Sequence, residues 1–186
     1  MIPLLASSVI AMTVILERLY FWRRRRPRLA DHDILNLVGD GDLPQAMQLA
    51  STSRNPVSRV LGCGIAANHL SPGAAMQAAA QTELSHARRY LPILDTVITL
   101  APLLGLLGTI TGMISAFGIV SEAGLGQPHA ITGGIAEALI ATATGLLIAI
   151  MTLIPYNYLR SRVKRLTDTL EEQSTRLELL LGKWED

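Results

Sequence analysis

The sequence has one cysteine and little charge, and both shortages exclude large classes of protein. Charged residues make up 17% of the 186 residues and hydrophobic residues 49%, whereas a soluble domain usually carries about a quarter charged residues. A disordered chain and an ordinary soluble enzyme are therefore disfavoured. The single cysteine, Cys63, cannot form an internal disulfide, and no CxxC or Cys/His pair suggests a metal, so we expect no metal and no cofactor.

Basic residues are absent from one long stretch. None of the 16 lysines and arginines lies among the 70 residues from Tyr90 to Leu159, and this stretch is strongly apolar. The net charge of +1 indicates no particular class of partner, and we expect the chain not to bind nucleic acid. The sequence also lacks a phosphate loop, a zinc-binding HExxH and a GxSxG elbow. No nucleophile, base and orienting group form a plausible set, so we predict a membrane protein that is not an enzyme.

Three apolar segments are long enough to cross a bilayer, which takes about 20 helical residues. They are residues 1–22, 93–120 and 131–156. The first differs from a signal peptide because its basic cluster, Arg23 to Arg26, follows the apolar run instead of preceding it. We therefore expect an uncleaved anchor with its N-terminus outside the cytoplasm.

The basic clusters also predict how the chain is oriented. One cluster follows the first span, and a second, Arg160 to Arg165, follows the third. The connection at residues 121–130 has no basic residue. Because basic residues near span ends favour the cytoplasm, both clusters belong there and the connection forms a periplasmic loop.

Residues 23–92 are predicted to be a cytoplasmic helical region. One helix should end near Gly39, a second should begin at Leu43, and Pro56 should open a third. Ser71 is expected to cap a further helix whose first turn contains Pro72. No strong terminator follows, so we expect that helix to continue directly into the second span.

Residues 157–186 are predicted to be a cytoplasmic amphipathic helix that continues the third span. Leucine and valine recur there at steps of three and four, with charged residues between them. We expect this helix to pack in a cytoplasmic bundle with the long second helix of its own chain, and also to contact other subunits. The fold class predicted is an all-α integral membrane protein with three transmembrane helices, long cytoplasmic helical extensions and an oligomeric helix bundle.

The second and third spans each carry a stripe of small residues at helical spacing. The stripe contains Ala101, Gly105, Gly108, Gly112 and Ala116 in the second span, and Gly134, Ala138, Thr142, Gly145, Ala149 and Thr152 in the third. Small residues at these steps let helix backbones approach closely in lipid. They indicate tight packing within one chain, a helix ring around a narrow pore, or both.

Glu137 is the one ionisable residue well inside the second and third spans. A charge at that depth costs several kcal/mol unless it is neutralised, paired or hydrated, and neither span offers a lysine or arginine. Glu137 must therefore be protonated, hydrogen-bonded to serine or threonine, or facing water or a partner. We interpret it as functional, although some intramembrane acids are structural. Glu17 and Arg18, at the cytoplasmic end of the first span, are interpreted as snorkelling residues of the interface.

Thr109 and Thr142 are predicted to lie at the same depth. If the chain turns at the middle of residues 121–130, two residues lie at the same depth when their numbers sum to 251. The numbers 109 and 142 meet this condition. Each hydroxyl can bond a carbonyl of its own helix, or the pair can form a polar ring in a pore. Thr142 lies about 140° around the helix from Glu137, so the two cannot point the same way.

Two stretches resemble the MotA/TolQ/ExbB proton channel family. The run Ala101-Pro-Leu-Leu-Gly-Leu-Leu-Gly-Thr109-Ile-Thr-Gly112-Met-Ile-Ser-Ala-Phe117 is similar to the family's second-span signature. The run Gly134-Ile-Ala-Glu137-Ala-Leu-Ile-Ala-Thr142-Ala-Thr-Gly145-Leu is similar to the third-span signature of its ExbB and TolQ members. The three-span topology is similar too, and the resemblance is strongest to ExbB.

The resemblance implies a homopentamer in the bacterial inner membrane whose pore encloses single-span helices of an ExbD-like partner. Thr109 and Thr142 match the family's pore threonines, and Glu137 matches its third-span glutamate. Such a complex uses proton-motive force to energise TonB-dependent outer-membrane transport, together with a TonB-like protein. The short segment before the first span leaves direct contact with that protein in doubt at this end. The alternatives are a TolQ-like motor for envelope maintenance and a membrane scaffold that conducts no ions.

Overall fold

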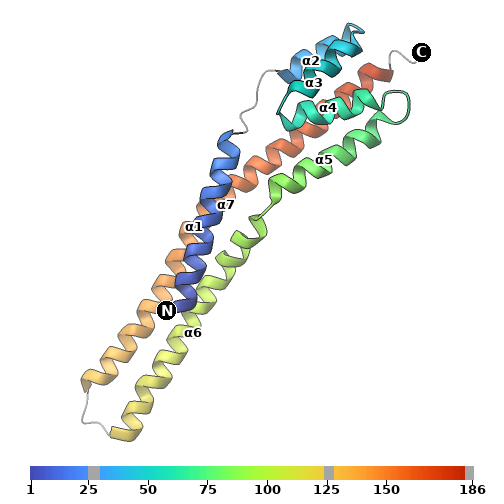
Figure 1. Cartoon of the computed structure of the whole chain (residues 1–186). Helices are drawn as coiled ribbons and strands as arrows, with labels where there is room; N and C mark the ends of the chain where they lie inside the picture. Colours follow the sequence, from blue (N-terminus) through green and yellow to red (C-terminus); the bar gives the residue numbers. More distant parts are fainter. Residues whose placement is uncertain (25–29, 124–127, 183–186) are drawn as a thin grey trace. The chain divides into compact units, whose positions relative to one another are not determined.

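The computed structural model describes residues 1–24, 30–123 and 128–182, and every regular element within them is an α-helix. The helices are α1 Ile2–Arg24, α2 Ala30–Gly39, α3 Leu43–Thr52, α4 Pro56–Ala66, α5 Pro72–Arg88, α6 Leu91–Ala123 and α7 Pro128–Gly182 (Figure 1). They form two compact units: a membrane unit (residues 1–19 and 90–159) and a bundle unit (residues 20–89 and 160–186).

Three helical stretches, residues 2–23, 72–118 and 132–182, are long and apolar enough to cross a membrane. The predicted all-α membrane fold is therefore confirmed. Both long helices continue through an internal proline, Pro102 in α6 and Pro155 in α7.

The short helices of the bundle unit begin where local sequence dictates. Asp42 caps α3 by accepting a hydrogen bond from the Gln45 amide at 3.1 Å. Asn55 caps α4 in the same way, accepting from the Val57 amide at 3.3 Å, and Pro56 occupies the first turn. The predicted starts at Leu43 and Pro56 are confirmed.

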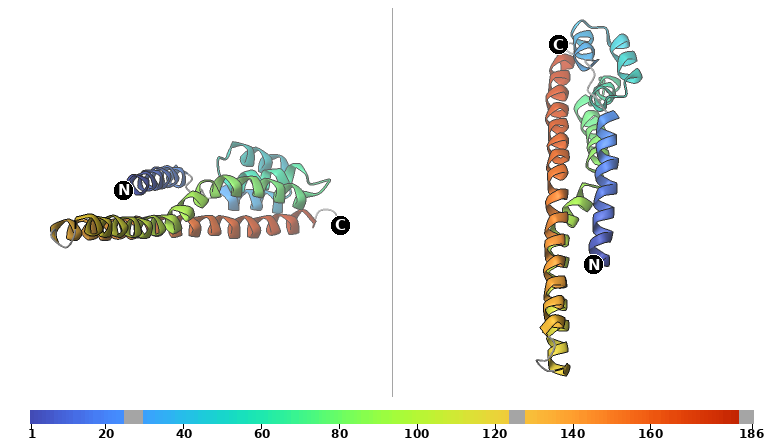
Figure 2. Two further views of the ribbon diagram at one scale, coloured as in Figure 1. Left: turned by 90° about the horizontal axis from the view of Figure 1, so that it is seen from below. Right: turned by 90° about the vertical axis from the view of Figure 1, so that its left-hand side faces the viewer.

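Helices α2 to α5 pack along the later part of α7 within the bundle unit (Figure 2). The buried side chains of this core come from all five helices, and they are Ile34, Leu35, Val38, Ala46, Ala50, Val57, Val60, Leu61, Ile65, Met76, Leu170, Leu177 and Leu181. The amphipathic face of α7 up to Gly182 is thus buried against helices of the same chain. The predicted packing within the chain is confirmed, but the core includes α2, α3 and α4 as well as the expected helix that begins at Pro72.

In the membrane unit, α6 and the first part of α7 run antiparallel, side by side (Figure 1). One face of α1, which includes Leu4, Ser7, Ala11 and Arg18, is also buried in this unit. Many large apolar side chains of α6 and α7 are exposed, as expected of helices that lie in lipid.

The expected continuous helix from Pro72 into the second span is wrong. Helix α5 ends at Arg88 and α6 begins at Leu91, because Tyr90 adopts a left-handed backbone conformation with φ of 68°. Such a φ is rare for a bulky residue, and no local sequence signal predicts it. Ser71 occupies the N-cap position of α5 with Pro72 in the first turn, as predicted, although its side chain makes no cap hydrogen bond.

The connection between the second and third spans is shorter than the predicted loop of residues 121–130. Helix α6 extends to Ala123 and α7 begins at Pro128. The remaining residues, 124–127, lie outside the described part of the chain, as do residues 25–29 of the first basic cluster.

Candidate functional site

The predicted stripes of small residues bring α6 and α7 into contact at the backbone. A Cβ atom added to Gly105 would lie 3.0 Å from both the Ala141 carbonyl oxygen and Thr142 Cα. One added to Gly145 would lie 2.5 Å from the Ala101 carbonyl oxygen and 3.1 Å from Gly105 Cα. Real Cβ atoms do not approach a fixed backbone this closely, so only glycine fits at Gly145.

The other glycines of the stripes also face the partner helix of the same chain. A Cβ added at Gly108 would lie 2.7 Å from Ala141 Cβ, and one at Gly112 would lie 2.8 Å from Ala138 Cβ. A Cβ at Gly134 would lie 2.9 Å from Ala116 Cβ. Of the two interpretations of these stripes, packing within one chain accounts for all five glycines.

This close approach places Thr109 and Thr142 together, as their equal depth predicts. Their hydroxyl oxygens are in hydrogen-bond contact, and both side chains are half-buried. Thr109 Oγ1 also lies 3.2 Å from the Gly105 carbonyl oxygen and 3.4 Å from that of Ala138. Thr142 Oγ1 lies 3.1 Å from the same Gly105 carbonyl oxygen. The Gly105 carbonyl is therefore a shared acceptor, which no side-chain pattern identifies.

Each hydroxyl has a single proton, so the two threonines donate only two of these hydrogen bonds at a time. In one arrangement Thr109 donates to the Gly105 carbonyl and Thr142 donates to Thr109. In the other, Thr142 donates to the carbonyl and Thr109 donates to Thr142. Thr109 therefore bonds a carbonyl of its own helix, Thr142 bonds a carbonyl of the other helix, and the contact between the hydroxyls joins two helices of one chain. The polar ring in a pore stays a prediction.

Glu137 lies away from this pair, on the exposed surface of α7. Within the described residues its carboxylate has no hydrogen-bond or ion-pair partner, so a hydrogen bond to a serine or threonine of its own chain is not observed. Since α7 is apolar on either side of this position, the carboxyl group lies on an otherwise apolar helix surface. Glu137 and Thr142 therefore point in different directions, as the helical spacing predicts.

Arg18 differs from its interpretation as a snorkelling residue. Its side chain is only 3% exposed, it pairs with Glu17, and its guanidinium carbon lies 5.1 Å from the centre of the Tyr90 ring. A buried cation over an aromatic face is a stabilising contact. This contact connects the C-terminal part of α1 to Tyr90, whose backbone conformation separates α5 from α6.

Comparison with known proteins shows which family and which relatives this chain is similar to. A family model described as the MotA/TolQ/ExbB proton channel family matches residues 55–172. The putative biopolymer transport protein ExbB-like 3 of Synechocystis sp. is 34% identical, over 100% of this chain and 91% of its own length. ExbB-like 1 of the same organism is 36% identical, over 97% and 74%. The Tol-Pal system protein TolQ of Haemophilus influenzae is 42% identical over 48% of this chain and 39% of its own length.

Proposed function

The chain belongs to the MotA/TolQ/ExbB proton channel family, and from that premise we propose that it is a stator subunit of the bacterial inner membrane. The family and the relatives indicate an ExbB/TolQ-type proton-channel subunit of biopolymer transport. The finer proposal is a homopentamer that, with an ExbD-like single-span partner, uses proton-motive force to energise TonB-dependent outer-membrane transport. Its N-terminus lies in the periplasm and its C-terminus in the cytoplasm.

The exposure of Glu137 is the observation that carries this proposal. A carboxyl group on the apolar surface of one protomer is costly in lipid, and intramembrane acids mark ion pathways by default. Its chain supplies no partner among the described residues, so the carboxyl group is either protonated in lipid or has a partner in the assembly, and we propose the second. A neighbouring subunit, an enclosed partner helix or pore water meets that need, and each of them places Glu137 inside a complex.

Thr109 and Thr142 support the same proposal. Their hydroxyls are held at one depth by the backbone contact of α6 and α7, and each hydroxyl still has acceptor capacity. A hydroxyl can therefore accept a hydrogen bond from a partner's protonated carboxyl group, and it can donate to the ionised form when it releases its bond to the Gly105 carbonyl. We propose that the pair serves the proton pathway in this way.

Proton flux through reconstituted complexes tests the role of Glu137. The chain is co-purified with its single-span partner, placed in liposomes, and assayed with an internal pH-sensitive dye under an imposed potential. Glu137→Ala should abolish the flux, Glu137→Asp should keep part of it, and Glu137→Gln should separate hydrogen bonding from ionisation. Asp95→Asn is the matched control, because Asp95 is an exposed acid near the start of α6 and lies outside the proposed pathway.

Oligomer yield is measured in the same preparations. Lost flux with normal assembly supports the proposed role, and full flux in Glu137→Ala contradicts it. If the unaltered complex carries no flux with its partner present, the chain is a scaffold that conducts no ions.

A TolQ-like role is the second candidate, favoured by the 42% identity to TolQ over 89 residues. The phenotype of a strain without this chain separates the two roles. Loss of energised uptake of iron complexes and vitamins supports the ExbB-like role. Detergent sensitivity with normal uptake supports envelope maintenance.

A further inference from the structure

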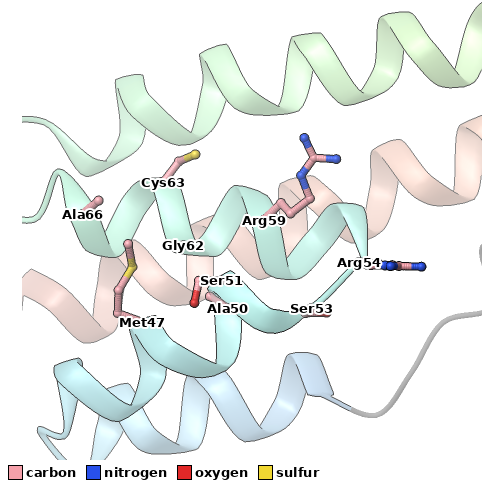
Figure 3. Close-up of a pocket in the computed structure, with 9 residues that line it drawn as sticks. All are labelled: Met47, Ala50, Ser51, Ser53, Arg54, Arg59, Gly62, Cys63 and Ala66. Carbon is pink, nitrogen blue, oxygen red and sulfur yellow. The ribbon is translucent and has the colours of Figure 1, made fainter.

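The bundle unit has an open cleft of about 1040 Å³ between α3 and α4. The two helices run antiparallel, joined by the short connection from Ser53 to Asn55. The floor of the cleft is shallow because small residues meet there: a Cβ added at Gly62 would lie 3.0 Å from Ala50 Cβ. No large side chain fills the space above them, so the cleft is open to a ligand along its length (Figure 3).

One end of the cleft is basic. Arg54 comes from the connection and Arg59 from the second turn of α4, and no acidic residue lines the cleft (Figure 3). Arg54 is exposed and makes no ion pair with the part of the chain that the structure describes. Arg59 pairs with Glu83 at 2.9 Å, yet its side chain stays 56% exposed while that of Glu83 is only 4% exposed. Glu83 lies on α5 and holds the Arg59 guanidinium on the side of α4 away from α3, where more than half of the arginine side chain stays exposed (Figure 3).

The other end is mainly apolar. Met47 lies on α3, and Cys63 and Ala66 lie on the later turns of α4 (Figure 3). Methionine is flexible and adapts to varied apolar partners. The cleft therefore runs from two guanidinium groups to a small apolar surface over the length of two helical turns or more.

We propose that this cleft binds an extended acidic peptide segment of a partner protein, with carboxylates at the arginine end and a small apolar side chain at the methionine end. Guanidinium groups pair with carboxylates through charge-assisted hydrogen bonds, which gives the basic end its preference. A nucleotide or free phosphate fits less well, because the floor consists of alanine and glycine and offers no converging donors. The first-turn amide of Val57 is already capped by Asn55.

Cys63 makes the proposal directly measurable, because it is the only thiol of the chain, is exposed and lines the cleft. The full-length protein in detergent is treated with N-ethylmaleimide, a neutral thiol reagent, at increasing concentrations of a blocked peptide. The peptide carries two aspartates followed by leucine and alanines, and a matched peptide has lysines in place of the aspartates. The acidic peptide should protect Cys63, and the lysine peptide should not.

Variants then test the two ends of the cleft. Arg54→Glu should raise the peptide concentration for half-protection by roughly tenfold or more, the ratio that about 1.4 kcal/mol produces. Arg176→Glu is the control, with the same charge change at an exposed arginine of α7 outside the cleft. Ala66→Phe should remove protection without a change of charge, by occupying the apolar end.

The proposal is overturned by no protection from the acidic peptide, by equal protection from the lysine peptide, or by an equal loss in Arg54→Glu and Arg176→Glu. Phosphatidylglycerol vesicles and inorganic phosphate are tested in parallel. Protection by either one in place of the peptide assigns the cleft to a phosphate group and also overturns it. The measurement needs no proton flux, so its outcome is independent of the proposed stator function.

Discussion

Replacing Gly145 by alanine is the smallest change that tests how α6 and α7 touch. The added methyl carbon would lie 2.5 Å from the Ala101 carbonyl oxygen, and its other near neighbours are backbone atoms of Gly105. Ordinary C···O contacts are about 3.3 Å or longer, so the helices must separate by roughly 0.8 Å at this point. Backbone atoms cannot rotate away as a side chain does, so the whole crossing must adjust.

The cost follows from that separation. A gap of about 0.5–1 Å forfeits a quarter to a half of the dispersion energy of the atoms involved, and overpacking a close contact costs about 1–3 kcal/mol. The hydrogen bond from Thr142 to the Gly105 carbonyl also lengthens, which adds about 0.6 kcal/mol in a membrane. We therefore expect Gly145→Ala to destabilise the membrane unit by about 2 kcal/mol relative to a control that meets no neighbour.

Gly118→Ala is that control. Gly118 lies in α6, and a Cβ there meets no atom within 4 Å. Both variants gain the same helix propensity, up to about 1 kcal/mol, so the difference between them isolates the contact. Helicity is followed by circular dichroism while the purified protein is unfolded from mixed micelles with sodium dodecyl sulfate. Equal unfolding midpoints for the two variants would refute the backbone contact at Gly145.

Three further predictions concern other contacts. Thr142→Val should leave assembly intact but stop proton flux, while Thr142→Ser retains much of it; lost assembly would instead indicate a packing role. Gln173 is 6% exposed, and its side-chain oxygen has no hydrogen-bond partner in the described structure. Gln173→Leu should therefore raise the free energy of unfolding of the bundle unit by about 1–3 kcal/mol. A lower denaturant midpoint would show that the amide is satisfied by another group. Arg18→Met should lower stability by about 2 kcal/mol through loss of the contact with Tyr90, and Tyr90→Leu in the same background should add little further loss. Additive losses in that double variant would mean that the two residues act independently.

Local chemistry explains why so much of this fold could be predicted. An apolar run of about 20 residues crosses a bilayer whatever its neighbours are, because the cost of leaving backbone groups unpaired in lipid forces a helix. Proline at the start of α4 and α5 acts within its own turn. The pairing of Thr109 with Thr142 needed only an antiparallel connection and a constant rise per residue. Counting residues along the two helices was therefore enough to predict this tertiary contact.

Tertiary contacts decided the rest, because they depend on residues distant in the sequence. Nothing near Tyr90 signals a helix break, and the buried Arg18 that contacts its ring lies more than seventy positions earlier. The glycine stripes predicted close packing, yet only the structure shows that their partner is the other helix of the same chain. The direction in which Glu137 faces, and the cleft between α3 and α4, likewise follow from how whole helices pack. The burial of a side chain depends on the residues around it in space. The sequence pattern predicts burial only where those residues are also close along the chain.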